Sequence, residues 1–464
     1  MIRLTKNITV YGTLILLALF LIHIFLERRL EDVRPTKHYD IRRDEEKFLT
    51  YLPHSGLHNQ RIALINSIIL AKALNRTLIM PELNLGTATY WRPSEHLPYR
   101  LDECGDKLWT TKHKNEDGTP WWSPNCFDYR NYLPMAVDSI FDLTAAQQQL
   151  GVKTIQRRDM KLNYFERYWG VPNDERNRTL VYQVWDHSRY SYQIVDDDDV
   201  SMNGSSKFME QYTLQQLEQH QETFLIFNSL FGSDRLALRS AQWTRTRDFL
   251  RQEIGVRQPW VLNSSLDIIG RLGGQGAYMS VHIRMGDGIF RKMMDETMER
   301  VRQQLIQQDN LHEINQTTLD MIQSLASQPE QRLTACLQLQ HQANLHSRLR
   351  LIYMTTDAPS PHQSLPHLFE EFVCLFTLDD FKDIVDATLA LRPTLLDHQH
   401  QHHNNHSTKT PPTTKGDIFL PLIDAEVASQ ASFFVPTPKS TFSGYINYRN
   451  KRFRSMYTLS SSSL

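Results

Sequence analysis

Apolar positions in the first half of the chain predict a strand, a helix and a second strand. Residues 48–52 and 77–80 are short apolar runs with the length of buried strands. Between them, apolar residues recur at helical spacing on one face: Ile62, Ile65, Ile68 and Ile69. The pattern predicts a βαβ unit with a polar turn at residues 56–59, and the start of a helix at such a turn is suited to an anionic group.

The second half repeats the alternation. Strand-like runs occur at residues 277–283, 350–354, 372–376 and 433–435, separated by helical stretches. Alternating strands and helices in two halves predict the α/β class, with two Rossmann-like domains facing a cleft. We place the N-terminal domain at residues 46–256 and the C-terminal domain at 257–453, followed by a tail at 454–464.

The N-terminus has a different character. Residues 8–26 carry no formal charge and are long enough to cross a bilayer as a helix. A cleaved signal peptide is the alternative, but the run is longer than a usual signal core and no A-x-A-like cleavage site follows. We therefore expect a retained transmembrane anchor, with a cytosolic tail at residues 1–7 and a charged stem at 27–45.

The flanking charges and the glycosylation signals disagree about orientation. More basic residues follow the apolar run than precede it, which by the positive-inside rule would leave the large domains in the cytoplasm. Long domains are, however, translocated largely regardless of such charges. N-x-S/T sequons, which favour the lumen, occur at Asn7, Asn75, Asn177, Asn203, Asn263, Asn315 and Asn405.

Composition narrows the choice of partners. The chain has 464 residues, too many for one ordinary core, and a formal net charge of −1, which gives no argument for nucleic-acid binding. Its four cysteines are Cys104, Cys126, Cys336 and Cys374. In an oxidising lumen we expect a Cys104–Cys126 bridge and consider a Cys336–Cys374 bridge; four buried thiols are the alternative.

Two polar segments invite a metal-site interpretation that we do not adopt. The aspartate run at residues 196–199 contains a D-x-D pattern, but its polar surroundings are typical of a solvated loop. The histidine-rich stretch within residues 397–415 runs into Thr, Pro and Lys and is typical of a disordered insertion. We expect no structural zinc and no metal requirement.

The most informative motif is H-I-R-M-G-D at residues 282–287. It follows a predicted strand, at the edge where open α/β sheets bind their ligands. The guanidinium of Arg284 presents a charged, planar fork that suits phosphate oxygens. Gly286 permits a close approach of the backbone, and the alternative role for Arg284 is a structural pair with Asp287.

Two further motifs stand in a fixed order around this one. G-L-H-N-Q-R occupies residues 56–61 and S-T-F-S occupies 440–443, while L-I-F-N-S-L-F-G at 225–232 lies between the halves. In this order and spacing, the motifs resemble those of the GDP-fucose protein O-fucosyltransferase family over residues 47–449. The resemblance implies a GT-B architecture and a single-pass type II membrane protein of the Golgi or endoplasmic reticulum, with a lumenal catalytic domain.

The resemblance also implies an activity and its site. It implies inverting, metal-independent transfer of fucose from GDP-fucose to a hydroxyl, with Arg284 as the catalytic residue that stabilises the departing diphosphate. The donor-binding residues that it implies are Asn59, His282, Arg284, Thr441, Phe442 and Ser443. The acceptor stays open among a protein Ser or Thr, an N-glycan core and a wall polysaccharide.

The catalytic base is the weak point of the resemblance. One branch of the family has a glutamate three residues before the first-motif asparagine, where this chain has Gly56. His54 and His58 are nearby and titrate in a suitable range, and either is equally compatible with a structural role. The alternative function is therefore a catalytically inactive, membrane-anchored relative that binds a sugar nucleotide or a glycan.

Overall fold

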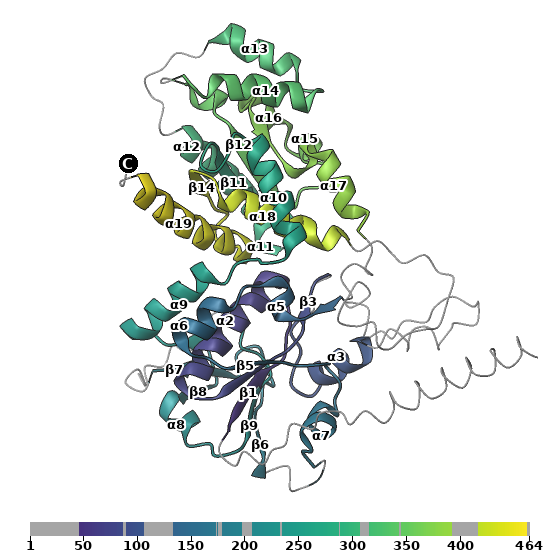
Figure 1. The fold of residues 1–464 in the computed structure, drawn as a ribbon, viewed down its shortest axis with the longest axis vertical. Coiled ribbons are helices and arrows are strands. Elements are labelled where there is room, and N and C mark those ends of the chain that lie inside the picture. Colours follow the sequence, from purple (N-terminus) through teal and green to yellow (C-terminus); the bar gives the residue numbers. More distant parts are fainter. Residues whose placement is uncertain are drawn as a thin grey trace, which may run out of the picture.

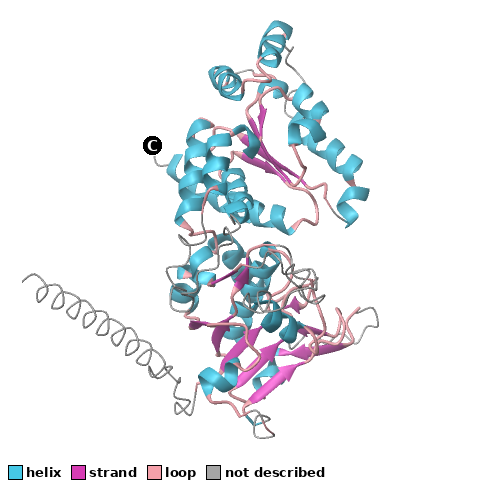
Figure 2. Ribbon diagram, turned by 90° about the vertical axis from the view of Figure 1, so that its right-hand side faces the viewer, coloured by secondary structure: helices cyan, strands magenta, loops and turns pink. Residues whose placement is uncertain are grey.

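The computed structural model describes residues 46–461 with several gaps. The gaps are residues 87–89, 106–132, 173, 175–178, 197–206, 233, 287, 307–314, 343–344 and 392–415. Two α/β units lie one above the other in Figure 1, and Figure 2 shows the strands of the upper unit between helices on both sides. The predicted α/β class with parallel sheets is confirmed.

The N-terminal unit is built on a five-stranded sheet in which every pairing is parallel. Its strand order is β5-β2-β1-β9-β6. The strands are β5 (Thr154–Gln156), β2 (Thr77–Met80), β1 (Phe48–Tyr51), β9 (Phe224–Phe227) and β6 (Val181–Val184). The strands predicted at residues 48–52 and 77–80 are thus the central pair, and all five carboxyl ends meet at one edge.

Helix α2 (Leu57–Ala73) links β1 to β2. It begins at Leu57, inside the turn that was predicted at residues 56–59. Gly56 is its N-cap, so the residues from Leu57 to Asn59 form the first helical turn. The helix is buried on nearly all sides rather than on one face. The reason is that it packs on β1 and β2 below and is covered by α9 (Ala241–Glu253) and α19 (Thr441–Ser461).

The C-terminal unit has a four-stranded parallel sheet of order β13-β12-β11-β14. The strands are β13 (Leu375–Phe376), β12 (Ile352–Thr356), β11 (Met279–Ile283) and β14 (Phe433–Val435). All four predicted strands are present, and β14 has the predicted bounds. Strand β13 begins later than predicted, because Phe372 closes the preceding helix through its N–H bond to the carbonyl of Leu368, 2.8 Å.

Helices cover both sheets. Those of the N-terminal unit also include α3 (Leu97–Gly105), α5 (Val137–Ile140), α6 (Thr144–Leu150), α7 (Tyr164–Trp169) and α8 (Leu214–Glu218). Those of the C-terminal unit also include α10 (Pro259–Arg271), α11 (Gly288–Lys292), α12 (Met294–Ile306), α13 (Gln316–Ser324), α14 (Pro329–Leu339), α15 (Pro361–Ser364), α16 (Pro366–Glu371), α17 (Lys382–Leu389) and α18 (Leu420–Ser429). Short 3-10 turns are η3 (Ser347–Leu349), η4 (Leu378–Asp380) and η6 (Gly416–Phe419).

Two small sheets were not predicted. One is parallel, of order β10-β7-β8, and the other pairs β3 with β4 antiparallel. Their strands are β10 (Leu236–Ala237), β7 (Tyr192–Val195), β8 (Glu210–Thr213), β3 (Leu83–Asn84) and β4 (Pro134–Met135). Strand β7 is fully buried although it directly precedes the aspartate run.

Helix α19 ties the two units together. It packs on α18 in its own unit and lies beside α9 of the other (Figure 1). Arg449 donates from Nη1 to the carbonyl of Gln252 at 2.6 Å, and the N–H of Val256 donates to the hydroxyl of Tyr445 at 3.1 Å. The guanidinium of Arg449 lies so close to Gly255 that a Cβ there would be 2.4 Å from it.

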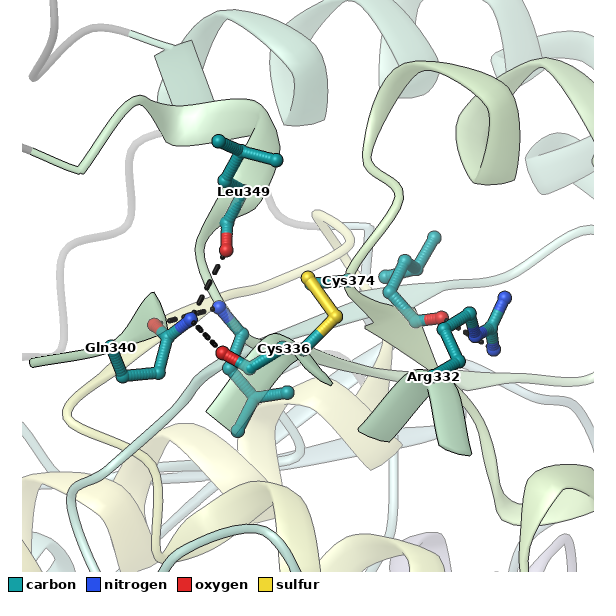
Figure 3. Close-up of a disulfide and its surroundings, with 7 residues drawn as sticks. Arg332, Cys336, Gln340, Leu349 and Cys374 are labelled. Carbon is teal, nitrogen blue, oxygen red and sulfur yellow. Dashed lines mark hydrogen bonds between the residues drawn. A yellow bond between two sulfur atoms is a disulfide. The ribbon is translucent and has the colours of Figure 1, made fainter. Parts of the chain in front are cut away.

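A disulfide joins Cys336 of α14 to Cys374, just before β13 (Figure 3). Beside it, the Gln340 amide donates to the carbonyls of Cys336 and Leu349, at 2.9 and 3.1 Å. Cys126 of the other expected bridge lies outside the described residues, as do the anchor at residues 8–26 and the histidine-rich stretch. Within the described part of the chain, no helix has the length and apolar character needed to cross a membrane.

Candidate functional site

Aromatic side chains from the two α/β units meet beside the carboxyl ends of β1, β11 and β14. His58, in the first turn of α2, contacts the ring of Phe442 from α19, with centroids 5.1 Å apart. Phe442 in turn contacts the ring of His282 at the end of β11, at 4.8 Å. Side chains from all three sequence motifs therefore meet. They do so at the carboxyl ends of parallel strands, where such sheets bind ligands.

A cavity of about 400 Å³ opens beside Phe442 at the carboxyl ends of β11 and β12. It is large enough for part of a nucleotide. Its lining consists of His282, Arg284, Met354, Thr356, Asp357, Ala358, Pro361, Thr377, Leu378, Asp379, Leu420, Pro421, Asp424 and Phe442. The wall combines one cation, several carboxyl groups and apolar surface.

Arg284 is held at the mouth of this cavity. Its side chain is 28% exposed, with Nε 4.0 Å from Oδ2 of Asp357 and the guanidinium carbon 4.6 Å from the ring centre of Phe290. Asp357 also accepts from the N–H groups of Met285, at 2.6 Å, and Gly286, at 3.1 Å. The carboxylate thus orients the turn after β11 and sits beside the guanidinium.

This arrangement requires glycine at position 286 because the carboxylate of Asp357 lies close to its Cα, and not because of its φ angle. A Cβ at this position would lie 2.7 Å from Oδ2 of Asp357. Any larger residue would push the carboxylate away from the turn and from Arg284. Asp287, the alternative partner of Arg284 in the sequence, lies outside the described residues.

His282 is buried and oriented by a hydroxyl network. Its Nδ1 lies 2.6 Å from Oγ of Ser443, and that oxygen accepts from the N–H of Thr437 at 3.0 Å. Thr437 also donates from Oγ1 to the carbonyl of His282, at 2.6 Å. Burial, with the nearby charge of Arg284, lowers the pKa of His282 to about 3, so the ring is neutral at pH 7.

Ser443 engages one ring nitrogen of His282. Its Oγ accepts from the N–H of Thr437 and has a second lone pair, so either tautomer of His282 satisfies the contact to Nδ1. His282 lines the cavity, and Nε2 is the ring nitrogen that Ser443 does not engage.

The third motif divides into two roles at the start of α19, whose first residue is Thr441. Ser443 is buried and serves the histidine network, and Ser440 accepts from its N–H at 3.3 Å. Thr441 and Phe442 are partly buried in the first turn, where a helix does not use its own N–H groups. Those groups suit phosphate oxygens. Ser443 thus lies behind the cavity, not on it.

The first motif is mostly structural. The amide of Gln60 donates to the carbonyls of Ser55 and Asn84, both at 3.0 Å, and Arg61 donates from Nε to the carbonyl of Ile254 at 2.8 Å. Asn59 differs, because its buried Oδ1 accepts no hydrogen bond from the described residues. Of this motif, Asn59 has the amide left to meet a ligand.

The two histidines considered as catalytic bases, His54 and His58, lie in environments that lower their pKa. Burial, with Arg235 and Arg189, lowers the pKa of His54 to about 3; burial, with Arg61 and His282, lowers that of His58 to about 3. His54 also holds Ser55 and Ser229 through its two ring nitrogens, at 2.9 and 2.6 Å. A base so weakly basic gives little driving force for proton transfer near neutrality.

Several residues of the site were missed in the sequence. Asp379 and Asp424 line the cavity, and burial raises the pKa of Asp424, bonded to the Tyr353 hydroxyl at 2.7 Å, to about 8. Outside the cavity lining, Glu82 follows β2 at the carboxyl edge of the N-terminal sheet, where burial, reinforced by Asp159, raises its pKa to about 8. Asp379 and Glu82 each come just after a short apolar run. That position is the sequence feature by which they could have been identified as candidate site residues.

The other singled-out residues lie away from the cavity. Asp196, the described member of the aspartate run, accepts from the N–H of Ser240 at 3.0 Å and so supports the start of α9. Among the described side chains, no three His, Cys, Asp or Glu groups gather as a metal site. Asn75, Asn263 and Asn315 are exposed, and Asn315 also caps α13 by accepting from the N–H of Thr318 at 3.1 Å. The sequons at Asn7, Asn177, Asn203 and Asn405 lie outside the described residues.

Comparisons give only distant likenesses. No protein-family model and no curated protein matches this chain. A crystal structure of POFUT1 in complex with GDP aligns over 88% of this chain and 95% of its own, with 10% identity and a TM-score of 0.40. The fucosyltransferase NodZ from Bradyrhizobium aligns over 87% and 93%, with 12% identity and a TM-score of 0.36. These scores are low, so the likenesses alone assign no activity.

Proposed function

We propose that this chain is an inverting fucosyltransferase of GT-B type that moves fucose from GDP-fucose to an acceptor hydroxyl. The observation that carries the proposal is the convergence on one cavity of Arg284, His282 and Phe442, the last from the first turn of α19. A cation, a neutral imidazole and a helix N-terminus together form a site for a diphosphate. Among diphosphate ligands, we choose GDP-fucose because the order and spacing of the three sequence motifs resemble those of GDP-fucose transferases.

The chemistry follows from where charge develops. The acceptor oxygen attacks C1 of fucose, the bond from C1 to the diphosphate breaks, and the acceptor proton leaves to a base. Negative charge then grows on the departing oxygen, and Arg284 stabilises it by preorganised electrostatics. Arg284, the helix turn and Asn59 supply the contacts, so no step in this scheme depends on a metal.

The nucleoside would occupy the far part of the cavity. Met354, Leu378 and Pro361 offer apolar surface for a base, and the carboxyl group of Asp379 lies on the same wall. A carboxylate accepts hydrogen bonds only, so it suits the two adjacent N–H donors of guanine. Burial and the neighbouring Asp380 raise the pKa of Asp379, which marks it as a partly desolvated acceptor.

The test is transfer of labelled fucose. The full-length chain, purified in detergent, is incubated with GDP-[14C]fucose and, separately, with a folded-protein pool, an N-glycan pool and a polysaccharide pool. We expect label in one pool and release of GDP in step with it. Tight GDP binding with no transfer to any pool would favour an inactive relative over the enzyme, and no GDP binding would reject both the enzyme and a relative that binds a sugar nucleotide.

A further inference from the structure

An exposed tryptophan follows the carboxyl end of an edge strand in the N-terminal sheet. Trp185 is the first residue after β6, and 50% of its surface is exposed. Its ring is parallel to that of His187, with an interplanar angle of 5° and centroids 6.0 Å apart. An indole left in water retains a large apolar face, on which the apolar side of a ligand can pack.

The backbone under this ring is rigidly held. Asp186 is completely buried and accepts from the indole N–H of Trp91 at 3.1 Å and from Nη1 of Arg235 at 3.2 Å. Its own N–H donates to Oγ of Ser94 at 2.9 Å, and its carbonyl accepts from the N–H of Ser94 at 3.0 Å. The exposed indole is therefore presented on a fixed frame, not on a loose loop.

Polar groups flank the ring. Nδ1 of His187 lies 2.5 Å from Oε1 of Glu95, and these side chains are 66% and 45% exposed. We call Trp91, Glu95, Trp185 and His187 the aromatic ledge. A sugar ring has an apolar face of C–H groups, which packs flat on an indole, and equatorial hydroxyls, which bond to carboxylate and imidazole groups at its rim.

The ledge shares its sheet edge with the segment that leads to the first motif. In the parallel sheet, Val184 is level with Phe227 of β9, which is level with Tyr51 of β1. Two strand spacings separate the start of the ledge from the segment after β1, about 10 Å. That segment leads to His54 and then to Asn59, so the ledge and the first motif follow the carboxyl ends of strands in one sheet.

We propose that the aromatic ledge is an acceptor subsite that binds a sugar ring, so that the acceptor of this chain is a glycan. This inference rests on the proposed fucose transfer. A peptide acceptor would instead be recognised through strand pairing or through pockets for its side chains. The ledge offers a flat ring and a charged rim.

The test measures glycan binding apart from turnover. Saturation-transfer NMR is recorded on the full-length chain in detergent with saturating GDP, using the N-glycan core pentasaccharide, chitotriose, cellotetraose and a threonine peptide. We expect at least one oligosaccharide to bind, with Trp185→Ala weakening it at least tenfold and Trp185→Phe weakening it less. Tyr457→Ala, which removes a 55% exposed aromatic on α19, should leave binding unchanged.

Each outcome decides between the alternatives. Unchanged oligosaccharide binding in folded Trp185→Ala, or no binding of any oligosaccharide by the wild type, would overturn the ledge. Peptide binding that Trp185→Ala abolishes would make it a protein-acceptor surface and would also overturn it. GDP titration of the same samples tests the proposed function separately. GDP binding without glycan binding that depends on Trp185 would overturn the ledge alone, and such glycan binding without GDP binding would overturn the proposed function alone.

Discussion

At the residue scale, position relative to a strand end was readable from the sequence, but the direction of a side chain was not. His282 lies at the end of an apolar run and Arg284 directly follows it, so the rule for parallel sheets predicted both at the ligand-binding edge. Ser443 was grouped with the donor-binding residues, yet its hydroxyl turns inward to His282. That choice depends on the residue at which α19 begins, which the motif does not specify.

Asp379 provides a residue-scale prediction. Asp379→Asn keeps the shape of the side chain but replaces one acceptor oxygen by a donor, which would face the donors of guanine. We expect the Kd for GDP to rise roughly ten- to a hundred-fold, the scale of losing a charged hydrogen bond. Calorimetry with GDP and UDP measures this, and the wild type should prefer GDP.

The matched control is Asp386→Asn, on the exposed side of α17. It should leave the Kd for GDP at the wild-type value. Equal GDP affinity in Asp379→Asn and the wild type would remove Asp379 from the nucleoside pocket, without bearing on Arg284.

At the element scale, the strands of the C-terminal sheet and the central pair of the N-terminal sheet were predictable, and the strands of the two small sheets were not. The predicted strands all belong to the main parallel sheets, because continuous apolar runs mark strands that are buried on both faces. Strands β3, β4 and β10 have two residues each, too few for any periodicity. The sequence predicted a single buried face for helix α2, because it does not reveal that α9 and α19 cover the other sides of the helix.

The Cys336–Cys374 disulfide gives a prediction for α14 and β13. It closes a loop of 38 residues, so its removal should lower the free energy of unfolding by roughly 3 to 4 kcal/mol in the chain-entropy description. Cys336→Ser and Cys374→Ser should be destabilised alike, and the double variant no further. Denaturant unfolding checks this; a wild-type midpoint in either single variant would show that the bridge adds no stability.

At the scale of the whole molecule, the alternation of strands and helices predicted the α/β class, whereas the contacts that link the two α/β units could not be predicted from it. Helix α19 belongs to the C-terminal unit but packs on α9, and Tyr445 and Arg449 bond to the chain near its crossing between units. Such contacts join residues almost two hundred positions apart, beyond any local pattern. They place Phe442 against His58 and so complete the site.

We further propose that the chain is a type II membrane protein with both α/β units in the lumen. The exposed side chains of Asn75 and Asn263 are then expected to be N-glycosylated. Endoglycosidase treatment of the cell-derived protein should increase its gel mobility, and the Asn75→Gln, Asn263→Gln pair should reduce the shift. An absent shift, together with digestion by protease added outside intact vesicles, would contradict this topology.

The most direct measurement is fucose transfer by variants of Arg284. Arg284→Ala should lower the turnover rate roughly a hundred-fold or more, the scale of losing one preorganised charge stabiliser. Arg284→Lys should restore only part of it, because a point charge does not reproduce a planar fork. Arg300→Ala, which removes an exposed arginine of α12, should transfer at the wild-type rate. Near-normal transfer by a folded Arg284→Ala variant would contradict the account.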